Sequence, residues 1–457
     1  MLGGHLKWVL ALIIALHVLL LAKTTFFPYS ELFVYPYLAN NGLLPYRDIL
    51  DQHFPGLLFL PLNFNTLGMT TPRVALAWLL GSVVLNHWLM YFVATKLLKL
   101  GKKAVLVNLL YFIFQPVFEG NVLWLDSFLP SLLLLTYIFM ASYIDSNKFK
   151  YLELSGLMLG LAVVFKQVTI PLVIILACYL LVVRRNSKEV LLYLLAFFLP
   201  VLLMLVYLSA IGVLVDFWYW TVVYNLTIFA ESGRKAILSF SDLVKPLFVF
   251  TPAFLLWILH FKNKKVFLLG LFMIGSLGAI YARFDFIHLQ PSLPFAVLLL
   301  GSCFTAKRQP KLFAHLLCVG YLLVGCALVV RFYKSNLGDN VVFFDRDVVN
   351  ITTKVRELTS PGQKIFVYGA IPHIYQTTQT VPAGDVFVFQ FPWFMTVAEE
   401  RVFDGLVMDT PAIIVSDLTV SVSGKKLTDY TPRIKNYIDR YYDLVYTSGN
   451  LNILTRR

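Results

Sequence analysis

Long apolar runs recur through most of the chain before residue 331, and they limit its possible folds more than any other feature. Each run approaches the roughly 20 residues that a helix needs to cross a bilayer. We expect membrane spans at residues 6–22, 73–95, 104–118, 122–143, 151–166, 168–183, 190–210, 244–261, 266–282, 290–306 and 312–330. The pattern predicts a polytopic α-helical membrane protein with about eleven transmembrane helices.

The composition excludes a water-soluble globular protein. Hydrophobic residues make up 59% of the 457 residues and charged residues only 14%, whereas soluble domains carry roughly 25% charged residues. The net charge of +13 does not indicate nucleic-acid binding, because the lysines and arginines lie in short clusters between the apolar runs. We expect membrane lipids around the chain and no nucleic-acid partner.

The basic clusters also predict an orientation. They follow alternate spans, at Lys96, Lys99, Lys102 and Lys103; Lys148 and Lys150; Arg184, Arg185 and Lys188; Lys262, Lys264 and Lys265; and Lys307, Arg308 and Lys311. By the positive-inside rule these connections and the N-terminus are cytoplasmic. An odd number of spans then puts everything after Arg331 outside.

The connection at residues 23–72 is the first outer loop and the richest in candidate functional residues. It holds five ionisable side chains close together: Glu31, Arg47, Asp48, Asp51 and His53. Ionisable groups beside a bilayer are costly and usually functional, so the loop is a site hypothesis. The alternative is a solvated connector.

Residues 332–457 change character and predict a second domain after the transmembrane domain of residues 1–331. KIFVYG at 364–369 and PAIIVSD at 411–417 read as buried strands, AIPHIYQTT as a turn and helix, and VAEERVFDGLV as an amphipathic helix. We expect a small extracytoplasmic α/β domain. No glycine-rich phosphate loop follows either strand, so nucleotide binding is not expected.

The other outer connections also carry polar side chains, and each of these has a functional and a structural interpretation. Lys166 lies at a junction between two short spans, where it either snorkels to the interface or reaches a polar cavity. Glu119 and Asp126 line a cavity or cap a helix. Arg283 either binds an anion or pairs with Asp285, and His53 and His288 have the alternative of a satisfied interface histidine.

Aromatic residues dominate FWYWTVVYNLTIF at 217–229. One reading is an aromatic belt in the headgroup layer. The other is a wall for a prenyl chain or a stacking surface for a sugar ring.

Four segments resemble the C-type glycosyltransferases that use lipid-linked sugars. They are SELFVYPYLANNGLLPYRDILDQHFPG in the first outer loop, FEGNVLWLDSFLPSLL, FKQVT and YARFDFIHLQPSLPF. The chain is similar to bacterial protein O-mannosyltransferases and to the lipid A aminoarabinose transferase, and an outer C-terminal domain also occurs in that family. The resemblance implies a bacterial plasma (inner) membrane location, a polyprenyl-phosphate sugar donor, and a hydroxyl acceptor on a protein, lipid or glycan.

One departure concerns the base. The family usually has an Asp followed by a Glu near the start of the first loop, with the Asp taken as catalytic, whereas Ser30 precedes Glu31 in this chain. The resemblance therefore leaves Glu31, Asp48 and Asp51 as candidates for the base, in that order. A catalytically inactive relative that only binds lipid-linked sugar is the alternative.

The chemistry of the residues agrees with such a transfer. A carboxylate is needed to deprotonate the acceptor, and cations are needed to hold the phosphate as charge develops. The candidates for substrate and phosphate binding are Arg47, His53, Glu119, Asp126, Lys166, Arg283 and His288. The carboxylates are compatible with a divalent metal ion, but no ligand spacing requires one.

Two other classes share features with this chain. A transporter or flippase has a similar number of spans, but it tends to show internal repeats and charges near mid-membrane, and the acids here cluster at one face. A polysaccharide polymerase or ligase also uses lipid-linked substrates. It would be distinguished by a large outer loop late in the chain, whereas the longest expected loop between spans is here the first.

Overall fold

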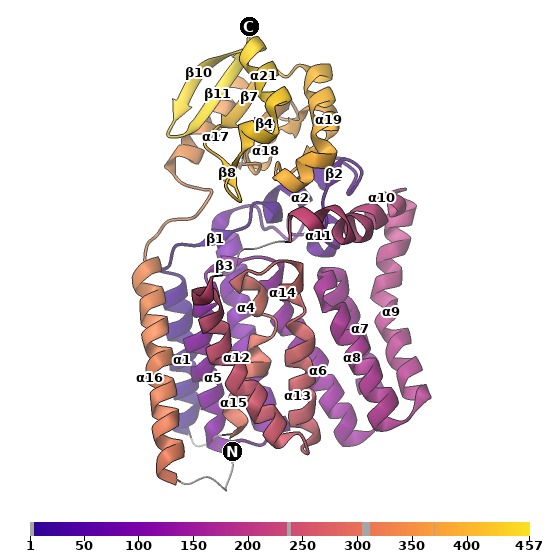
Figure 1. Ribbon diagram of the computed structural model, residues 1–457, viewed down its shortest axis with the longest axis vertical. Helices are drawn as coiled ribbons and strands as arrows, with labels where there is room; N and C mark the ends of the chain where they lie inside the picture. Colours follow the sequence, from indigo (N-terminus) through magenta and orange to yellow (C-terminus); the bar gives the residue numbers. More distant parts are fainter. Residues whose placement is uncertain (1–3, 235–238, 304–310, 370) are drawn as a thin grey trace. The chain divides into compact units, whose positions relative to one another are not determined.

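The computed structural model describes residues 4–234, 239–303, 311–369 and 371–457. Its contacts divide the chain into two compact units (Figure 1). The helical unit comprises Met1–Phe26, Ala75–Met204 and Ala236–Asp339, and the mixed unit comprises Phe27–Val74, Leu205–Lys235 and Asn340–Arg457. The boundary expected at residue 331 falls inside a helix, and contacts group the first outer loop with the C-terminal part.

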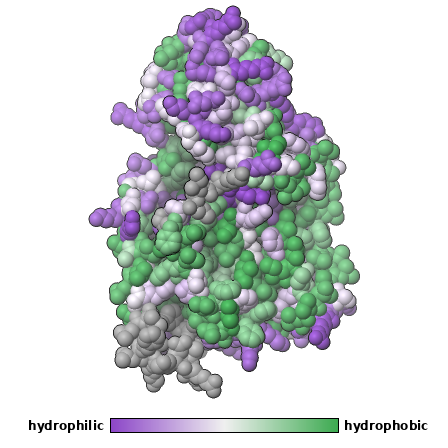
Figure 2. All heavy atoms as spheres, viewed as in Figure 1, coloured by the Kyte–Doolittle hydropathy of each residue, from purple (hydrophilic) through white to green (hydrophobic). Residues whose placement is uncertain are grey.

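The helical unit is built from apolar helices, as the runs predict. They are α1 (Gly4–Leu21), α4 (Pro72–Phe92), α5 (Ala104–Val117), α6 (Leu129–Ser146), α7 (Phe149–Phe165), α8 (Ile170–Tyr179), α9 (Ser187–Ala210), α12 (Phe240–His260), α13 (Lys264–Ser276), α14 (Ala279–Ala282), α15 (Leu293–Cys303) and α16 (Lys311–Asn336). Figure 2 shows hydrophobic side chains over much of the face of the helical unit that it draws.

Some of these helices are long and apolar enough to cross a membrane. Within the described residues, six helices are long and apolar enough: Pro72–Leu97, Leu125–Ser146, Gln167–Arg184, Ser187–Ala210, Asp242–His260 and Lys264–Tyr281. The apolar helices Leu6–Leu21 and Leu293–Ser302 are shorter. The end of the span expected at 290–306, with Lys307 and Arg308, lies outside the described residues, and the count of eleven stays a prediction.

The break expected at FKQV is confirmed. α7 ends at Phe165, Lys166 takes an extended conformation with φ −159° and ψ 121°, and a short 3₁₀ turn, η4 (Gln167–Thr169), leads into α8. π-helical turns lengthen other helices at η1 (Val93–Leu97) and η5 (Leu180–Arg184). No apolar pattern predicts such turns, because they insert one residue without changing composition.

Glycine allows α7 to approach α9 closely. A Cβ atom at Gly160 would meet the carbonyl oxygen of Phe197 and two ring carbons of Pro200 at 3.1 Å. Since interiors are already close-packed, a larger residue would have to displace backbone there.

A five-stranded sheet forms the core of the mixed unit, in the order β10-β11-β7-β4-β5. β4 (Lys364–Tyr368) pairs in parallel with β7 (Ile413–Asp417) and with β5 (Val381–Pro382), and the hairpin β10 (Tyr442–Ser448) and β11 (Leu451–Arg456) adds antiparallel strands. The two strands read from KIFVYG and PAIIVSD are confirmed.

Helices and short elements complete this part of the chain. Two expected helices are confirmed as α18 (Ile374–Thr378) and α19 (Pro392–Asp409). The other elements are α17 (Arg346–Leu358), η8 (Ala383–Asp385), β6 (Phe387–Val388), β8 (Ser421–Val422), β9 (Lys425–Lys426), α20 (Leu427–Tyr430) and α21 (Pro432–Tyr441).

The first outer loop packs onto the C-terminal part within the mixed unit. It contains β1 (Phe27–Pro28), α2 (Glu31–Asn40), β2 (Ile49–Leu50) and α3 (Gly56–Phe59). β2 pairs in parallel with β6, with Ile49 opposite Phe387, and α2 contacts α18. This pairing fixes the loop residues that carry the candidate site.

Candidate active site

Glu31 opens α2 and lines a cavity of about 100 Å³. Its side chain is buried, and Ser30 Oγ donates a hydrogen bond to its Oε2 at 3.5 Å. Most of the wall is apolar; the lining residues are Tyr29, Ser30, Glu31, Phe343, Gly369, Phe389, Gln390, Phe391, Val420, Val422 and Leu427. A carboxyl group here meets little water and few polar partners.

Burial raises the pKa of Glu31 to about 8. The negative charge of Asp51 contributes to this rise, whereas the backbone N–H of Glu31 itself and the Ser30 hydroxyl oppose it. A carboxyl group with a pKa near the working pH can both accept and release a proton. Glu31 therefore has the electrostatics of an acid–base group.

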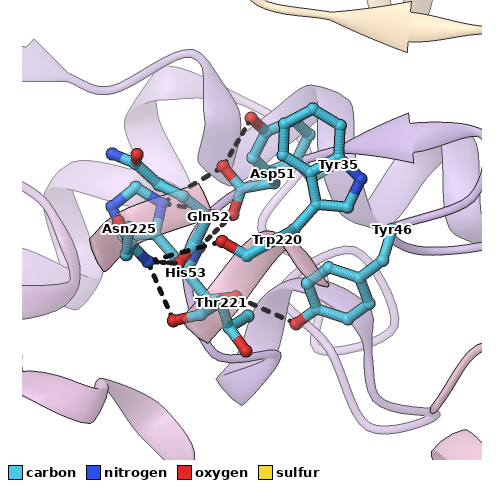
Figure 3. A network of polar contacts seen from close by, with 8 residues as sticks. All are labelled: Tyr35, Tyr46, Asp51, Gln52, His53, Trp220, Thr221 and Asn225. Carbon is cyan, nitrogen blue, oxygen red and sulfur yellow. Dashed lines mark hydrogen bonds and ion pairs between the residues drawn. The ribbon is translucent and has the colours of Figure 1, made fainter. Parts of the chain in front are cut away.

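Asp51 is held as a carboxylate in a polar network (Figure 3). Tyr35 Oη donates to its Oδ1 at 2.9 Å, and the backbone N–H and Nδ1 of His53 lie 2.9 and 3.1 Å from its Oδ2. Burial acts to raise the pKa of Asp51, but the charge and hydrogen bonds of His53, with the Tyr35 hydroxyl, hold it below its ordinary value. Neighbouring carboxyls with pKa values pushed apart are typical of acid–base sites.

Tyr46 extends this network to the backbone. Its hydroxyl donates to the carbonyl oxygen of His53 at 2.9 Å, and its side chain is fully buried. His53 is thus fixed through both its ring and its backbone, with about a fifth of its side chain exposed (21%).

Arg47 and Asp48 lie outside this network and have structural partners. Arg47 pairs with Asp216, at 3.1 Å from Nε and 3.0 Å from Nη2, and also donates to the carbonyl oxygen of Gly212. Asp48 accepts from the backbone N–H of Leu44 at 2.9 Å and from Arg401 at 3.2 Å. These contacts weaken Asp48 as a base candidate, because each of its two carboxylate oxygens already accepts a hydrogen bond.

A second cluster lies in the helical unit and joins Asp126, Lys166 and His288. Lys166 Nζ contacts Asp126 Oδ2, and His288 Nδ1 lies 3.0 Å from the same oxygen. Asp126 and Lys166 are buried, and Asp126 Oδ1 has no hydrogen-bond partner. The structure thus brings together three of the predicted substrate-binding residues.

Glu119 lies in the turn after α5, near the 3₁₀ turn η7 (Phe286–Leu289), which also carries His288. Its Oε2 accepts from the backbone N–H of Ile287 at 3.1 Å. Burial, together with the neighbouring carboxylate of Asp285, raises the pKa of Glu119 to about 8. Arg283 begins the extended link between α14 and η7.

Sequence reasoning missed Tyr35 and Gln290. Tyr35 lies four residues after Glu31 on α2, so helical spacing could have placed both on one side of the helix. Gln290 Nε2 donates to the carbonyl oxygens of Gln115 and Phe118, at 2.9 and 2.7 Å, and holds the turn before Glu119. No local signal points to Gln290, because its partners lie more than 170 residues away.

Metal ligands are not grouped in the part of the chain that the structure describes. There, no set of three or more His, Cys, Asp or Glu side chains could hold a metal ion. The pairs at Asp51–His53 and Asp126–His288 are too small to form such a set.

Comparison with known proteins gives a family match and a fold. The dolichyl-phosphate-mannose-protein mannosyltransferase family matches residues 59–209. No curated protein sequence matches the chain closely enough to count as a relative.

Solved structures match over nearly the whole chain. The crystal structure of ArnT from Cupriavidus metallidurans bound to undecaprenyl phosphate is similar with a TM-score of 0.69 and 12% identity, covering 99% of this chain and 98% of that one. Its apo state gives 0.62 and 13%, covering 99% and 97%. The oligosaccharyltransferase of Archaeoglobus fulgidus, in complex with Zn and sulfate, gives 0.50 and 12%, covering 96% and 72%. These matches confirm the resemblance expected from the sequence.

Proposed function

We propose that this chain, a membrane glycosyltransferase with the C-type fold, transfers a sugar from a polyprenyl-phosphate donor to an acceptor hydroxyl, with Glu31 as general base. The observation that carries the proposal is the buried Glu31 carboxyl on a cavity wall, with its pKa raised to about 8. The family match and the undecaprenyl phosphate named for one ArnT structure support the donor class.

In the proposed reaction the acceptor oxygen attacks the anomeric carbon of the donor sugar. A carbon–oxygen bond to the acceptor forms, the bond from the anomeric carbon to the phosphate oxygen breaks, and polyprenyl phosphate leaves. The hydroxyl proton passes to the Glu31 carboxylate. A base with a pKa near the working pH suits this step, because it accepts the proton strongly and is still partly ionised.

Asp51 supports this role from the same unit. Its charge raises the pKa of Glu31, and its own ionised form is stabilised by His53 and Tyr35. Asp51 would therefore stay charged while Glu31 exchanges its proton. Because of this division of roles, we rank Glu31 ahead of Asp51 as the base. Asp48 also ranks below Glu31, because it is paired with Arg401.

Lys166 and His288 are the proposed phosphate-binding groups of the helical unit, with Asp126 orienting both. Lysine acts on phosphate as a point charge, and a protonated histidine can donate to it. Arg283 is a further candidate for binding the phosphate, and Glu119 is a candidate for lining the donor cavity. Arg47 is a weaker candidate, because Asp216 already neutralises its charge.

We propose that the reaction takes place on the extracytoplasmic side of the plasma (inner) membrane, with the N-terminus cytoplasmic and residues 332–457 outside. Two facts support this orientation. The lysine and arginine clusters follow alternate apolar runs of the sequence, and the positive-inside rule makes these ends of the runs cytoplasmic. The first outer loop and the C-terminal part belong to one compact unit, so they share a side.

The test is transfer by the purified full-length chain from a mixture of polyprenyl-phosphate sugars, measured as released polyprenyl phosphate. Glu31→Gln should abolish release, since an amide cannot accept the proton. Glu400→Gln, which changes an exposed carboxylate of the same unit, should leave release unchanged. Wild-type release that Glu31→Gln does not reduce would exclude Glu31 as the base.

Ser30→Asp separates an active enzyme from an inactive relative. An enzyme that uses Glu31 should gain little from the added acid, whereas an inactive relative could regain turnover. Absence of both turnover and binding with every donor would contradict the transferase proposal and favour transport.

A further inference from the structure

The segment after α9 has two chemically different faces. It runs through α10 (Leu214–Trp218) and the π-helical turn η6 (Tyr219–Tyr224) to Leu226. One face exposes large apolar side chains, most of all at Val215 (82%), Leu226 (68%) and Trp218 (59%). The other face buries its side chains; they are Phe217, Trp220, Thr221 and Tyr224. We name residues 214–226 the interfacial segment.

The buried face of the interfacial segment is tied to the first outer loop and to α19. Asn225 Nδ2 donates to the backbone carbonyl of Gln52 at 2.9 Å (Figure 3). Tyr224 Oη donates to the carbonyl oxygen of Trp393 at 2.9 Å, and its ring stacks on Phe394 with an interplanar angle of 1°. All these residues belong to the mixed unit.

The interfacial segment closely follows, in the sequence, a helix that is apolar enough to span a membrane. This helix, α9, ends at Ala210. Three residues, 211–213, separate it from the start of α10 at Leu214. Val206, in the last turns of α9, is 57% exposed within the same unit. Exposed apolar patches of this kind are avoided in water and are typical of helices that lie in the membrane interface.

The low number of charged residues in the interfacial segment indicates what kind of membrane contact it can make. Between Leu214 and Phe229 the sequence has one charged residue, Asp216, and this residue is paired with Arg47. A docking face without lysines or arginines gains nothing from anionic headgroups. Its binding therefore comes from apolar burial and should not depend on salt or on lipid charge.

We propose that the apolar face of the interfacial segment docks into the headgroup–acyl boundary of the bilayer, and that Asn225 transmits this placement to the loop of Asp51 and His53. The amide of Asn225 also donates to the carbonyl oxygen of Thr221 at 3.0 Å, within its own segment. It thus links the interfacial segment to the backbone carbonyl of Gln52, the residue between Asp51 and His53. Asn225 is a positioning residue, and only this second part rests on the proposed function.

Docking is tested with the full-length chain in nanodiscs of phosphatidylcholine, with a benzophenone amino acid at position 218. Irradiation should cross-link position 218 to lipid, at low and high salt alike. The same group at Met408, a 72% exposed side chain of α19 on the same unit, is the control and should give no lipid adduct. Equal lipid labelling at both positions, no lipid adduct at 218, or cross-linking of 218 to a second copy of the chain would overturn the docking proposal.

The positioning role is tested by Asn225→Leu, which keeps the approximate volume and removes the donor. Amide hydrogen exchange of residues 51–53 should become faster, and kcat should fall about tenfold with little change in KM, as for the loss of one buried hydrogen bond. Thr227→Val, which removes only a hydroxyl that donates to the carbonyl oxygen of Val223, four residues earlier, should change neither. Unchanged exchange in Asn225→Leu would overturn the positioning role.

These readouts stay separate from the transferase proposal. Cross-linking and hydrogen exchange need no turnover, so they report on docking and positioning even if no donor is used.

Discussion

Tyr35 donates its hydroxyl to Asp51 at 2.9 Å and so joins the helix that begins at Glu31 to the loop that carries His53. The bond stabilises the charged form of Asp51, and that charge raises the pKa of Glu31. The acid–base behaviour of one carboxyl group is thus set partly by the other.

Asp51→Asn should shift the pH dependence of transfer. Removing the negative charge lowers the pKa of Glu31, so the base is ionised at lower pH. The acidic limb of kcat/KM against pH should move to lower pH. A profile of initial rates measures it, and Asp404→Asn, at an exposed position of α19, is the control. A limb that stays in place or moves to higher pH would contradict the coupling.

Glu31→Gln should change how stability depends on pH. The folded-state pKa of Glu31 is about 8 and its ordinary value is 4.5, so the folded state binds the proton more tightly. This stabilisation is present below pH 4.5 and is lost as the pH rises to 8. The Tm of the variant relative to wild type should therefore rise between about pH 5 and about pH 8.

Thermal unfolding of both proteins in the same detergent provides the measurement. A Tm difference that is constant over this range, or that falls, would show that Glu31 is not buried as a neutral acid.

Lys166→Met should destabilise the helical unit. It leaves the buried carboxylate of Asp126 without its lysine, and breaking a buried ion pair in this way costs about 3–5 kcal/mol. The double variant with Asp126→Asn should recover part of the loss, because no charge is then left uncompensated. The free energy of unfolding is the measurement.

Lys354→Met gives the matched control, since it breaks the exposed Lys354–Glu357 pair and should change the free energy of unfolding much less than Lys166→Met. Equal losses for the two lysines would argue against a buried pair at Asp126.

Gly160→Ala should separate α7 from α9. The new Cβ would press on the Phe197 carbonyl and the Pro200 ring, at a cost of about 1–3 kcal/mol. Gly81→Ala in α4 has no atom within 4 Å of the new Cβ and should stabilise by up to about 1 kcal/mol through helix propensity. Thermal unfolding should thus give opposite signs for the two alanines.

The sequence predicts those parts of the fold that local pattern controls. Apolar runs predict the helices, and KIFVYG and PAIIVSD predict the paired strands β4 and β7. The hairpin of β10 and β11 is not among the expected strands, although Ser448, Gly449 and Asn450 form a turn signal between β-formers.

Tertiary contacts explain what the sequence does not predict in the candidate site. The sequence does not show that Asp126, Lys166 and His288 form one cluster. Lys166 lies 40 residues from Asp126 and 122 residues from His288 along the chain. The engagement of Arg47 with Asp216, 169 residues away, depends on packing in the same way. Residue type marks a group as able to act, but only the fold decides whether a partner already occupies it.

The parallel pairing of β2 with β6 has a consequence for biosynthesis. Ile49 leaves the ribosome more than 300 residues before Phe387, its partner. At about 5–20 residues per second, the strand waits roughly 20 to 70 s for that partner. The cavity at Glu31 also needs residues 389–391 and 420–427, so a nascent chain already threaded into the membrane has no finished cavity until residue 427 has been synthesised. Proteolytic clearance of stalled chains would therefore remove molecules that were never able to react.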